Sequence, residues 1–156
     1  MQNKNVPAVE KAIQYFEGEY NCAQSVIKAL NGYSGLKMET AEALTAGFGG
    51  GIGGSQEICG AVSGACMAIS HAVYNMYIDH EDRKDIAKGA VKEFMEGFKQ
   101  EKKEVRCFEL TGHDFSIESE KEKFAELGLK QDICFPAVQY AVSLAIDIIQ
   151  AHEKGL

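Results

Sequence analysis

The residues best suited to chemistry in this chain are its cysteines. Its 156 residues include five cysteines, and no two of them have the two-residue spacing of a zinc ribbon or a thioredoxin-type dithiol. Cys66 follows Cys59 by two helical turns, about 10.5 Å along a helix axis, which is beyond disulfide reach within one helix. We interpret Cys66 as a core-packing residue. The candidate site residues are Cys22, Cys59, Cys107 and Cys134.

Three of the four candidate cysteines, Cys22, Cys59 and Cys134, are predicted to lie where helices begin. Cys22 directly follows Asn21, and asparagine is a preferred N-cap residue. Cys59 falls in the first turn or so of a long helix that we expect Ser55 to cap. The unpaired N–H groups and the dipole of a helix N-terminus stabilise a thiolate. Such positions therefore favour reactive or metal-binding sulfur.

Cys134 is the third candidate at a predicted helix start, and Cys107 has a basic neighbour. Cys134 comes two residues after Asp132, the expected cap of the last helix. Cys107 follows Arg106, whose positive charge favours the anion. Cysteine is also a common small hydrophobic residue, so packing alone could explain any one of them.

The charge of four thiolates limits the states that a shared site can adopt. Each uncompensated buried ion costs several kcal/mol, so four free thiolates in a core are untenable. The thiols must be protonated, paired as disulfides, or neutralised by a metal or an iron–sulfur cluster. Helix N-termini would donate N–H···S bonds to thiolates that bind such a cluster.

The glycine run GFGGGIGG at 47–54 superficially resembles a phosphate loop. Gly49, Gly51 and Gly54 satisfy G-x-G-x-x-G, but the preceding residues predict a helix and not the strand that a dinucleotide site needs. Ser and Gln follow Gly54, where a Walker loop has Lys and then Ser or Thr. We interpret the run as a close-packed helix–helix junction, with nucleotide binding as a weaker alternative.

Small residues continue into the helix after this run. They recur every four residues as Gly60, Gly64, Ala68 and Ala72. The last helix carries a matching set: Ala137, Ala141 and Ala145. We expect these two helices to pack at short distance, and the same stripes could instead serve a homodimer.

The elements that carry these residues are predicted to be helical. Apolar residues recur with helical spacing and period-two alternation is absent, so we expect an all-α fold: one compact multi-helix domain over residues 1–156, with a Gly-rich helix–helix junction. The expected helices cover 7–17, 22–30, 39–48, 56–77, 81–104, 116–127 and 133–152. Residues 107–115 are expected to form an irregular connection.

Composition restricts the partners and the compartment. The net charge of −7 argues against nucleic acid or an anionic membrane surface as the main partner. The chain has no basic-then-apolar leader and no run of about 18 uninterrupted apolar residues, so we expect neither a signal peptide nor membrane insertion. We expect a cytoplasmic protein, in which five cysteines indicate metal binding, redox chemistry or packing and not a disulfide framework.

Four stretches of the chain together resemble a known family. YNCAQSV, GFGGGIGGSQEICGAVSGA, RCFELTG and the C-terminal Cys134 are similar to the C_GCAxxG_C_C family of redox-active proteins over residues 15–150 or so. The four cysteines that name this family correspond to Cys22, Cys59, Cys107 and Cys134, whereas Cys66 lies outside the pattern. The resemblance implies a small helical domain with a redox role. An iron–sulfur cluster is one group that could carry out that role.

The sequence therefore predicts one site built from four cysteines. Its expected function is electron transfer or redox chemistry at an iron–sulfur cluster or another thiolate-bound metal, together with a redox partner protein. In a thiol–disulfide oxidoreductase, Cys59 would be the redox nucleophile, although Glu57 opposes a low thiol pKa there. A non-enzymatic zinc-binding or interaction module is the competing hypothesis. Enzymatic turnover, and any part played by His113 or Cys66, stay open.

Overall fold

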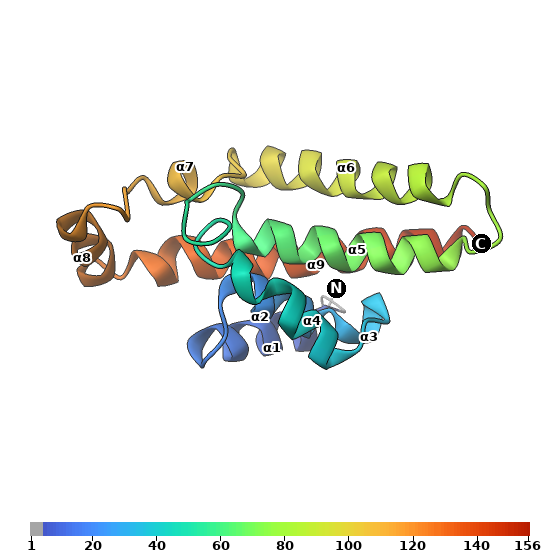
Figure 1. Cartoon of the computed structure of the whole chain (residues 1–156), viewed down its shortest axis with the longest axis horizontal. Coiled ribbons are helices and arrows are strands. Elements are labelled where there is room, and N and C mark those ends of the chain that lie inside the picture. Colours follow the sequence, from blue (N-terminus) through green and yellow to red (C-terminus); the bar gives the residue numbers. More distant parts are fainter. Residues whose placement is uncertain (1–4) are drawn as a thin grey trace.

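The computed structural model describes residues 5–156, and these are mostly helical (Figure 1). The helices are α1 (Val6–Glu17), α2 (Cys22–Ala29), α3 (Asn31–Ser34), α4 (Met38–Thr45), α5 (Gly60–Met76), α6 (Arg83–Lys102), α7 (Cys107–Thr111), α8 (Glu118–Glu126) and α9 (Phe135–Lys154). A 3-10 turn, η1 (Ala46–Phe48), follows α4, and a π-helix, η2 (Lys130–Cys134), precedes α9. Residues 5–156 contain no strand, only an isolated bridge between Ile58 and Arg106. The predicted all-α fold is confirmed.

Three long helices form the body of the molecule. α5, α6 and α9 lie side by side, and α1 to α4 cover one side of them (Figure 1). The interior between them is apolar, with fully buried side chains that include Ile69, Phe94 and Ile146. Burial of such large side chains stabilises the packed helices by about 1.5–3 kcal/mol each. α7 and α8 lie at the end of the molecule opposite the α5–α6 connection (Figure 1).

The start of α2 follows from a local sequence pattern. The Asn21 side chain accepts a hydrogen bond from the Gln24 N–H at 2.8 Å, and the Gln24 side chain accepts one from the Asn21 N–H at 3.2 Å. This reciprocal capping box satisfies two N–H groups that the helix leaves unpaired. Asn21 also donates to the Ala46 carbonyl at 3.0 Å, which ties α2 to η1. The predicted cap is confirmed, and it fixes Cys22 as the first residue of α2.

The start of α5 differs from the prediction. Ser55 does not cap this helix, because α5 begins at Gly60 with Cys59 as its N-cap residue. Ser55 Oγ instead donates to the carbonyl oxygens of Gly51 at 2.9 Å and Ile52 at 2.7 Å, within the glycine loop. This loop joins η1 to α5 and has positive φ at Gly50, Gly51, Ile52, Gly53 and Gly54. Residues 55–59 separate this run of positive φ from the first residue of α5.

The small-residue stripe of α5 packs differently from the expectation. α5 and α9 are in contact as predicted. The stripe begins, however, at Gly60 and Gly64, which face α2: a Cβ atom at position 64 would lie 2.5 Å from the Ala23 carbonyl oxygen. Glycine is required there because the main chains of α5 and α2 approach so closely.

The last helix begins earlier than the sequence indicates. Asp132 is not an N-cap residue, because it lies inside η2, which continues directly into α9. The resulting helical segment, Lys130–Lys154, is long and apolar enough to cross a membrane by length and composition. In this fold Val138, Val142 and Ile149 of α9 are fully buried, so core packing accounts for that apolar character.

Candidate functional site

All four candidate cysteines line a single cavity of about 210 Å³. They reach it from separate elements: the first residue of α2, the N-cap residue of α5, the first residue of α7 and the last residue of η2. The rest of the wall is almost entirely apolar and includes Phe16, Phe124 and Val138. The cavity therefore combines four soft sulfur donors with a dry surface.

Cys22 has several main-chain groups around its sulfur atom. Burial raises the pKa of its thiol, and hydrogen bonding from the main chain at Gly50, Ala23 and Gly60 opposes this rise. Gly60 must be glycine, since a Cβ atom there would collide with Cys22 Sγ. The glycine loop and the start of α5 thus bring N–H groups to one sulfur atom, an arrangement that suits a thiolate.

Cys59 is tied by its main chain to the segment that precedes α7. Its N–H donates to the Val105 carbonyl at 2.8 Å. Burial raises the pKa of the Cys59 thiol, the nearby Cys22 raises it further, and hydrogen bonding from the main chain at Ala61 and Val62 opposes these effects. The helix N-terminus at Cys59 therefore does not offset the rise in thiol pKa that burial causes.

Cys107 begins a helix that the sequence analysis did not predict. Residues 107–111 form α7 within the segment expected to be irregular. The Cys107 N–H donates to the Glu57 carbonyl at 2.7 Å, beside the Ile58–Arg106 bridge, so the segments carrying Cys59 and Cys107 are joined directly. The pKa of the Cys107 thiol is raised to about 11, mainly by burial and also by Cys22, while a hydrogen bond from Gln56 opposes the rise.

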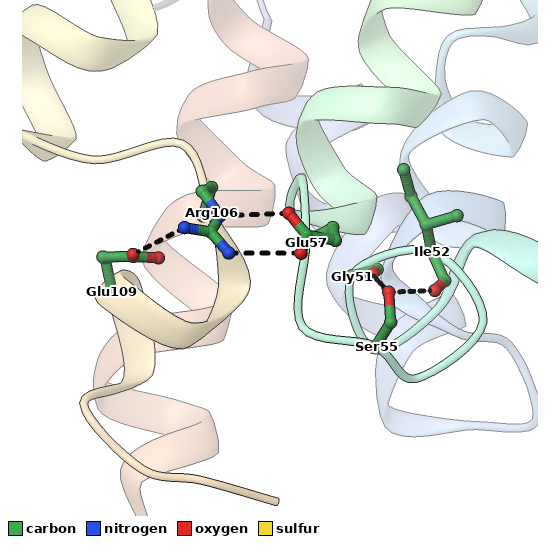
Figure 2. Close-up of polar contacts among 6 residues, drawn as sticks. All are labelled: Gly51, Ile52, Ser55, Glu57, Arg106 and Glu109. Atoms are coloured by element: carbon green, nitrogen blue, oxygen red, sulfur yellow. Dashed lines mark hydrogen bonds and ion pairs between the residues drawn. The ribbon is translucent and has the colours of Figure 1, made fainter.

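Arg106 does not act on Cys107 as the sequence analysis expected. Its guanidinium binds Glu57 through two hydrogen bonds of 3.1 and 3.2 Å and Glu109 through one of 3.0 Å (Figure 2). Arg106 has extended backbone, and adjacent side chains on extended backbone point in opposite directions. Its charge is therefore used in an exposed ion-pair cluster, away from the cavity.

Cys134 lies inside a continuous helical segment and not at a helix start. The N–H of the next residue, Phe135, already donates to the Lys130 carbonyl, so no open N-terminus faces this sulfur. The pKa of the Cys134 thiol is raised to about 12, mainly by burial and also by Cys22 and Cys107, while the Lys130 ammonium opposes the rise. The predicted stabilisation of a Cys134 thiolate by a helix dipole is therefore wrong, because η2 continues directly into α9.

Two residues that the sequence analysis missed also belong to the site. Lys130 is the charged side chain among the residues that line the cavity, and its ammonium lies 4.3 Å from the Phe16 ring centre. Gln56 is 6% exposed, and its side-chain amide donates to the His113 carbonyl at 2.8 Å and accepts from the Phe115 N–H at 2.7 Å. These contacts are long-range, so no local pattern signals either residue.

The remaining residues considered from the sequence lie away from the sulfur atoms. The His113 ring packs edge-on against Phe124 at 5.7 Å, and its Nδ1 pairs with the Thr111 carbonyl at 2.8 Å. Cys66 is packed against the core, with its sulfur 3.8 Å from Met95 Sδ, and burial raises its pKa to about 12. Neither His113 nor Cys66 lines the cavity.

Comparison with protein families places the chain in one family. A family model described as "Putative redox-active protein (C_GCAxxG_C_C)" matches residues 20–148. The chain belongs to this family. Neither the curated proteins nor the solved structures compared with the chain gave a match. The C_GCAxxG_C_C match includes every cavity cysteine and the whole glycine loop, and the family's description supports a redox role.

The sulfur atoms in this C_GCAxxG_C_C protein surround the cavity without meeting at one point. Within residues 5–156, no group of three or more histidine, cysteine, aspartate or glutamate side chains is arranged to hold one metal ion. A structural zinc ion needs four ligands within about 2.3 Å of one centre. In a four-iron cluster each cysteine binds its own iron atom, so the ligands stay apart.

The glycine loop shows none of the context of a nucleotide site. α4 and η1 precede it, so the strand of a dinucleotide-binding unit is missing from this part of the described chain. Gly51 faces the site: a Cβ atom there would lie 2.7 Å from the Cys107 Cβ. The loop contacts two of the cavity cysteines, Cys22 and Cys107, which accounts for its glycines without a phosphate.

Proposed function

We propose that this protein is a redox protein whose four cavity cysteines hold an iron–sulfur cluster. The observation that carries the proposal is the common cavity: four thiols from four separate elements line one apolar space of about 210 Å³. Liquid water occupies about 30 Å³ per molecule, so this space exceeds what a single ion needs. Cys22, Cys59, Cys107 and Cys134 would be the ligands.

The electrostatics of the site support a bound group that carries positive charge. Without one, burial keeps the thiols protonated at neutral pH, since the pKa values of Cys107 and Cys134 are raised to about 11 and 12. Binding iron releases these protons and compensates the thiolate charge. Lys130 and the main-chain N–H groups around Cys22 offset part of the negative charge that remains.

An iron–sulfur cluster supplies one-electron transfer, and the protein sets the conditions for it. The apolar wall formed by residues such as Phe16 and Val138 excludes water. Hydrogen bonds from N–H groups to ligand sulfur raise a cluster's reduction potential, and Cys22 and Cys59 both receive such bonds. These features support electron exchange with a redox partner protein over substrate turnover at the buried sulfur.

The competing hypotheses receive less support from the same geometry. The thiols are too dispersed for one zinc ion with four cysteine ligands. A dithiol mechanism that starts at Cys59 needs a thiolate there, and burial raises the pKa of that thiol. The cluster hypothesis requires neither a single convergence point nor a free thiolate.

The test is the visible spectrum of protein purified without oxygen. The proposal predicts a brown protein whose absorbance bleaches on reduction by dithionite and returns on reoxidation. A colourless protein that contains stoichiometric zinc would contradict the cluster and indicate a structural zinc ion instead. A protein that stays metal-free after anaerobic reconstitution with iron and sulfide would refute metal binding altogether.

A further inference from the structure

The segment from Gly112 to Gly128 forms one wall of the cysteine cavity and has few anchors to the rest of the chain. It contains α8, in which Phe124 is the only buried residue. Phe124 and Phe115 pack edge to face at 4.9 Å, and both rings line the cavity. The other side chains of α8 are largely exposed. The buried part that α8 contributes to this wall is therefore a single aromatic ring.

Both ends of the segment are glycines in the left-handed region. Gly112 has a φ of +67° directly after α7, and Gly128 has a φ of +65° two residues after the end of α8. Other residues rarely adopt this conformation, and glycine passes through it at low cost. A Cβ atom at position 112 would meet no atom within 4 Å, so Gly112 is not required by crowding. Both ends are suited to act as hinges.

One buried side chain ties this segment to the body of the molecule. The Gln56 amide donates to the His113 carbonyl at 2.8 Å, and its oxygen accepts the Phe115 N–H at 2.7 Å. Both bonds link the glycine loop to the connection between α7 and α8. Gln56 itself has a φ of +55°, so the loop backbone is bent to aim this amide inward. The Gln56 side chain therefore acts as a latch that holds residues 113–115 against the glycine loop.

We infer that residues 112–128 form a lid over the cysteine cavity, hinged at Gly112 and Gly128 and latched by Gln56. Opening of the lid removes Phe115 and Phe124 from the cavity wall and exposes the sulfur atoms from that side. Cluster insertion, or attack by an oxidant, would follow this route. The inference does not depend on what the cavity holds, so it is tested on the reduced, metal-free chain.

The experiment measures how fast iodoacetamide alkylates each cysteine at pH 8, with the labelled positions assigned by mass spectrometry. Gln56→Met keeps the length of the side chain and removes both hydrogen bonds. Cys22, Cys59 and Cys134 should then react at least tenfold faster than in the wild-type chain. Cys66 lies outside the cavity and should react at its wild-type rate, because the rest of the fold stays closed.

A matched pair of glycine variants tests the hinge. Gly112→Ala and Gly35→Ala introduce the same backbone strain, since both glycines have a φ near +70° and open space around them. Gly112→Ala should accelerate alkylation of the cavity cysteines, and Gly35→Ala at the end of α3 should not. Unchanged rates in both Gln56→Met and Gly112→Ala would overturn the lid. Equal acceleration at Cys66 would also overturn it, because the opening would then be global unfolding.

Discussion

The sulfur atom of Cys22 occupies the space in which a side chain at position 60 would begin. A Cβ atom on Gly60 would collide with that sulfur and would lie 2.9 Å from the Phe48 carbonyl oxygen. This contact joins the glycine-rich segment to the cysteine site in one step. Glycine at position 60 therefore allows the first turn of α5 to approach the Cys22 thiol.

Gly60→Ala should damage both the fold and the site. Overpacking at a rigid contact typically costs about 1–3 kcal/mol, and we expect that loss in the free energy of unfolding measured in urea. Displacement of Cys22 should also lower the iron bound per chain. Gly89→Ala in α6 is the matched control: no atom lies within 4 Å of its Cβ position, so alanine should stabilise the chain by about 0.5–1 kcal/mol. Equal effects at the two positions would contradict the contact.

The capping box of α2 predicts a second effect. Asn21→Ala removes the side chain that accepts the Gln24 N–H and donates to the Ala46 carbonyl, so it should cost about 1–2 kcal/mol of unfolding free energy. Asn21→Asp keeps the acceptor, loses the donor and places a negative charge beside the Ala46 carbonyl. Its unfolding free energy should lie between those of Asn21→Ala and the wild-type chain, and a value at or below that of Asn21→Ala would argue against the cap.

The raised thiol pKa values predict the pH dependence of the metal-free, reduced chain. The pKa values of Cys107 and Cys134 rise from 9.0 to about 11 and 12, so the folded state holds these protons more tightly than the unfolded state does. This contribution to stability is complete below pH 9 and is lost as the pH rises towards 11 or 12. The urea midpoint should fall over that range. Cys66→Ala should keep most of the decline, whereas a flat profile would show that the thiols are not buried.

The exposed ion pair of Arg106 should matter little. Arg106 and Glu57 are 45% and 54% exposed, and pairs in solvent typically contribute less than about 1 kcal/mol. A double-mutant cycle with Arg106→Met and Glu57→Gln should therefore give a coupling energy below that value, weakening further in high salt. A coupling of several kcal/mol would mean that this pair, and not the main-chain bridge, holds the Cys59 and Cys107 segments together.

Local patterns predicted those parts of the site that neighbouring residues determine. Asn21 and Gln24 are three residues apart, so their capping box and the position of Cys22 could be inferred directly. The helical class followed from apolar spacing in the long helices. The family resemblance selected the same four cysteines that line the cavity.

Long-range contacts determine the parts that could not be predicted. The five residues of α7 are fixed by main-chain bonds from Cys107 to Glu57 and from Phe108 to Gln56, which no local signal encodes. Gln56 gained its role from a bent backbone and from partners more than fifty residues away. Asp132 has the residue type of a cap, but the π-helix around it leaves no helix end to cap.

The most direct test of the central claim is the iron and sulfide content of anaerobically reconstituted single-cysteine variants. The four-cysteine account predicts that the serine variants of Cys22, Cys59, Cys107 and Cys134 each lose most of their iron and sulfide, together with their visible absorbance. Cys66→Ser should retain the wild-type content, because Cys66 lies outside the cavity. Equal iron and sulfide in all five variants, or their absence from the wild-type chain, would contradict the account.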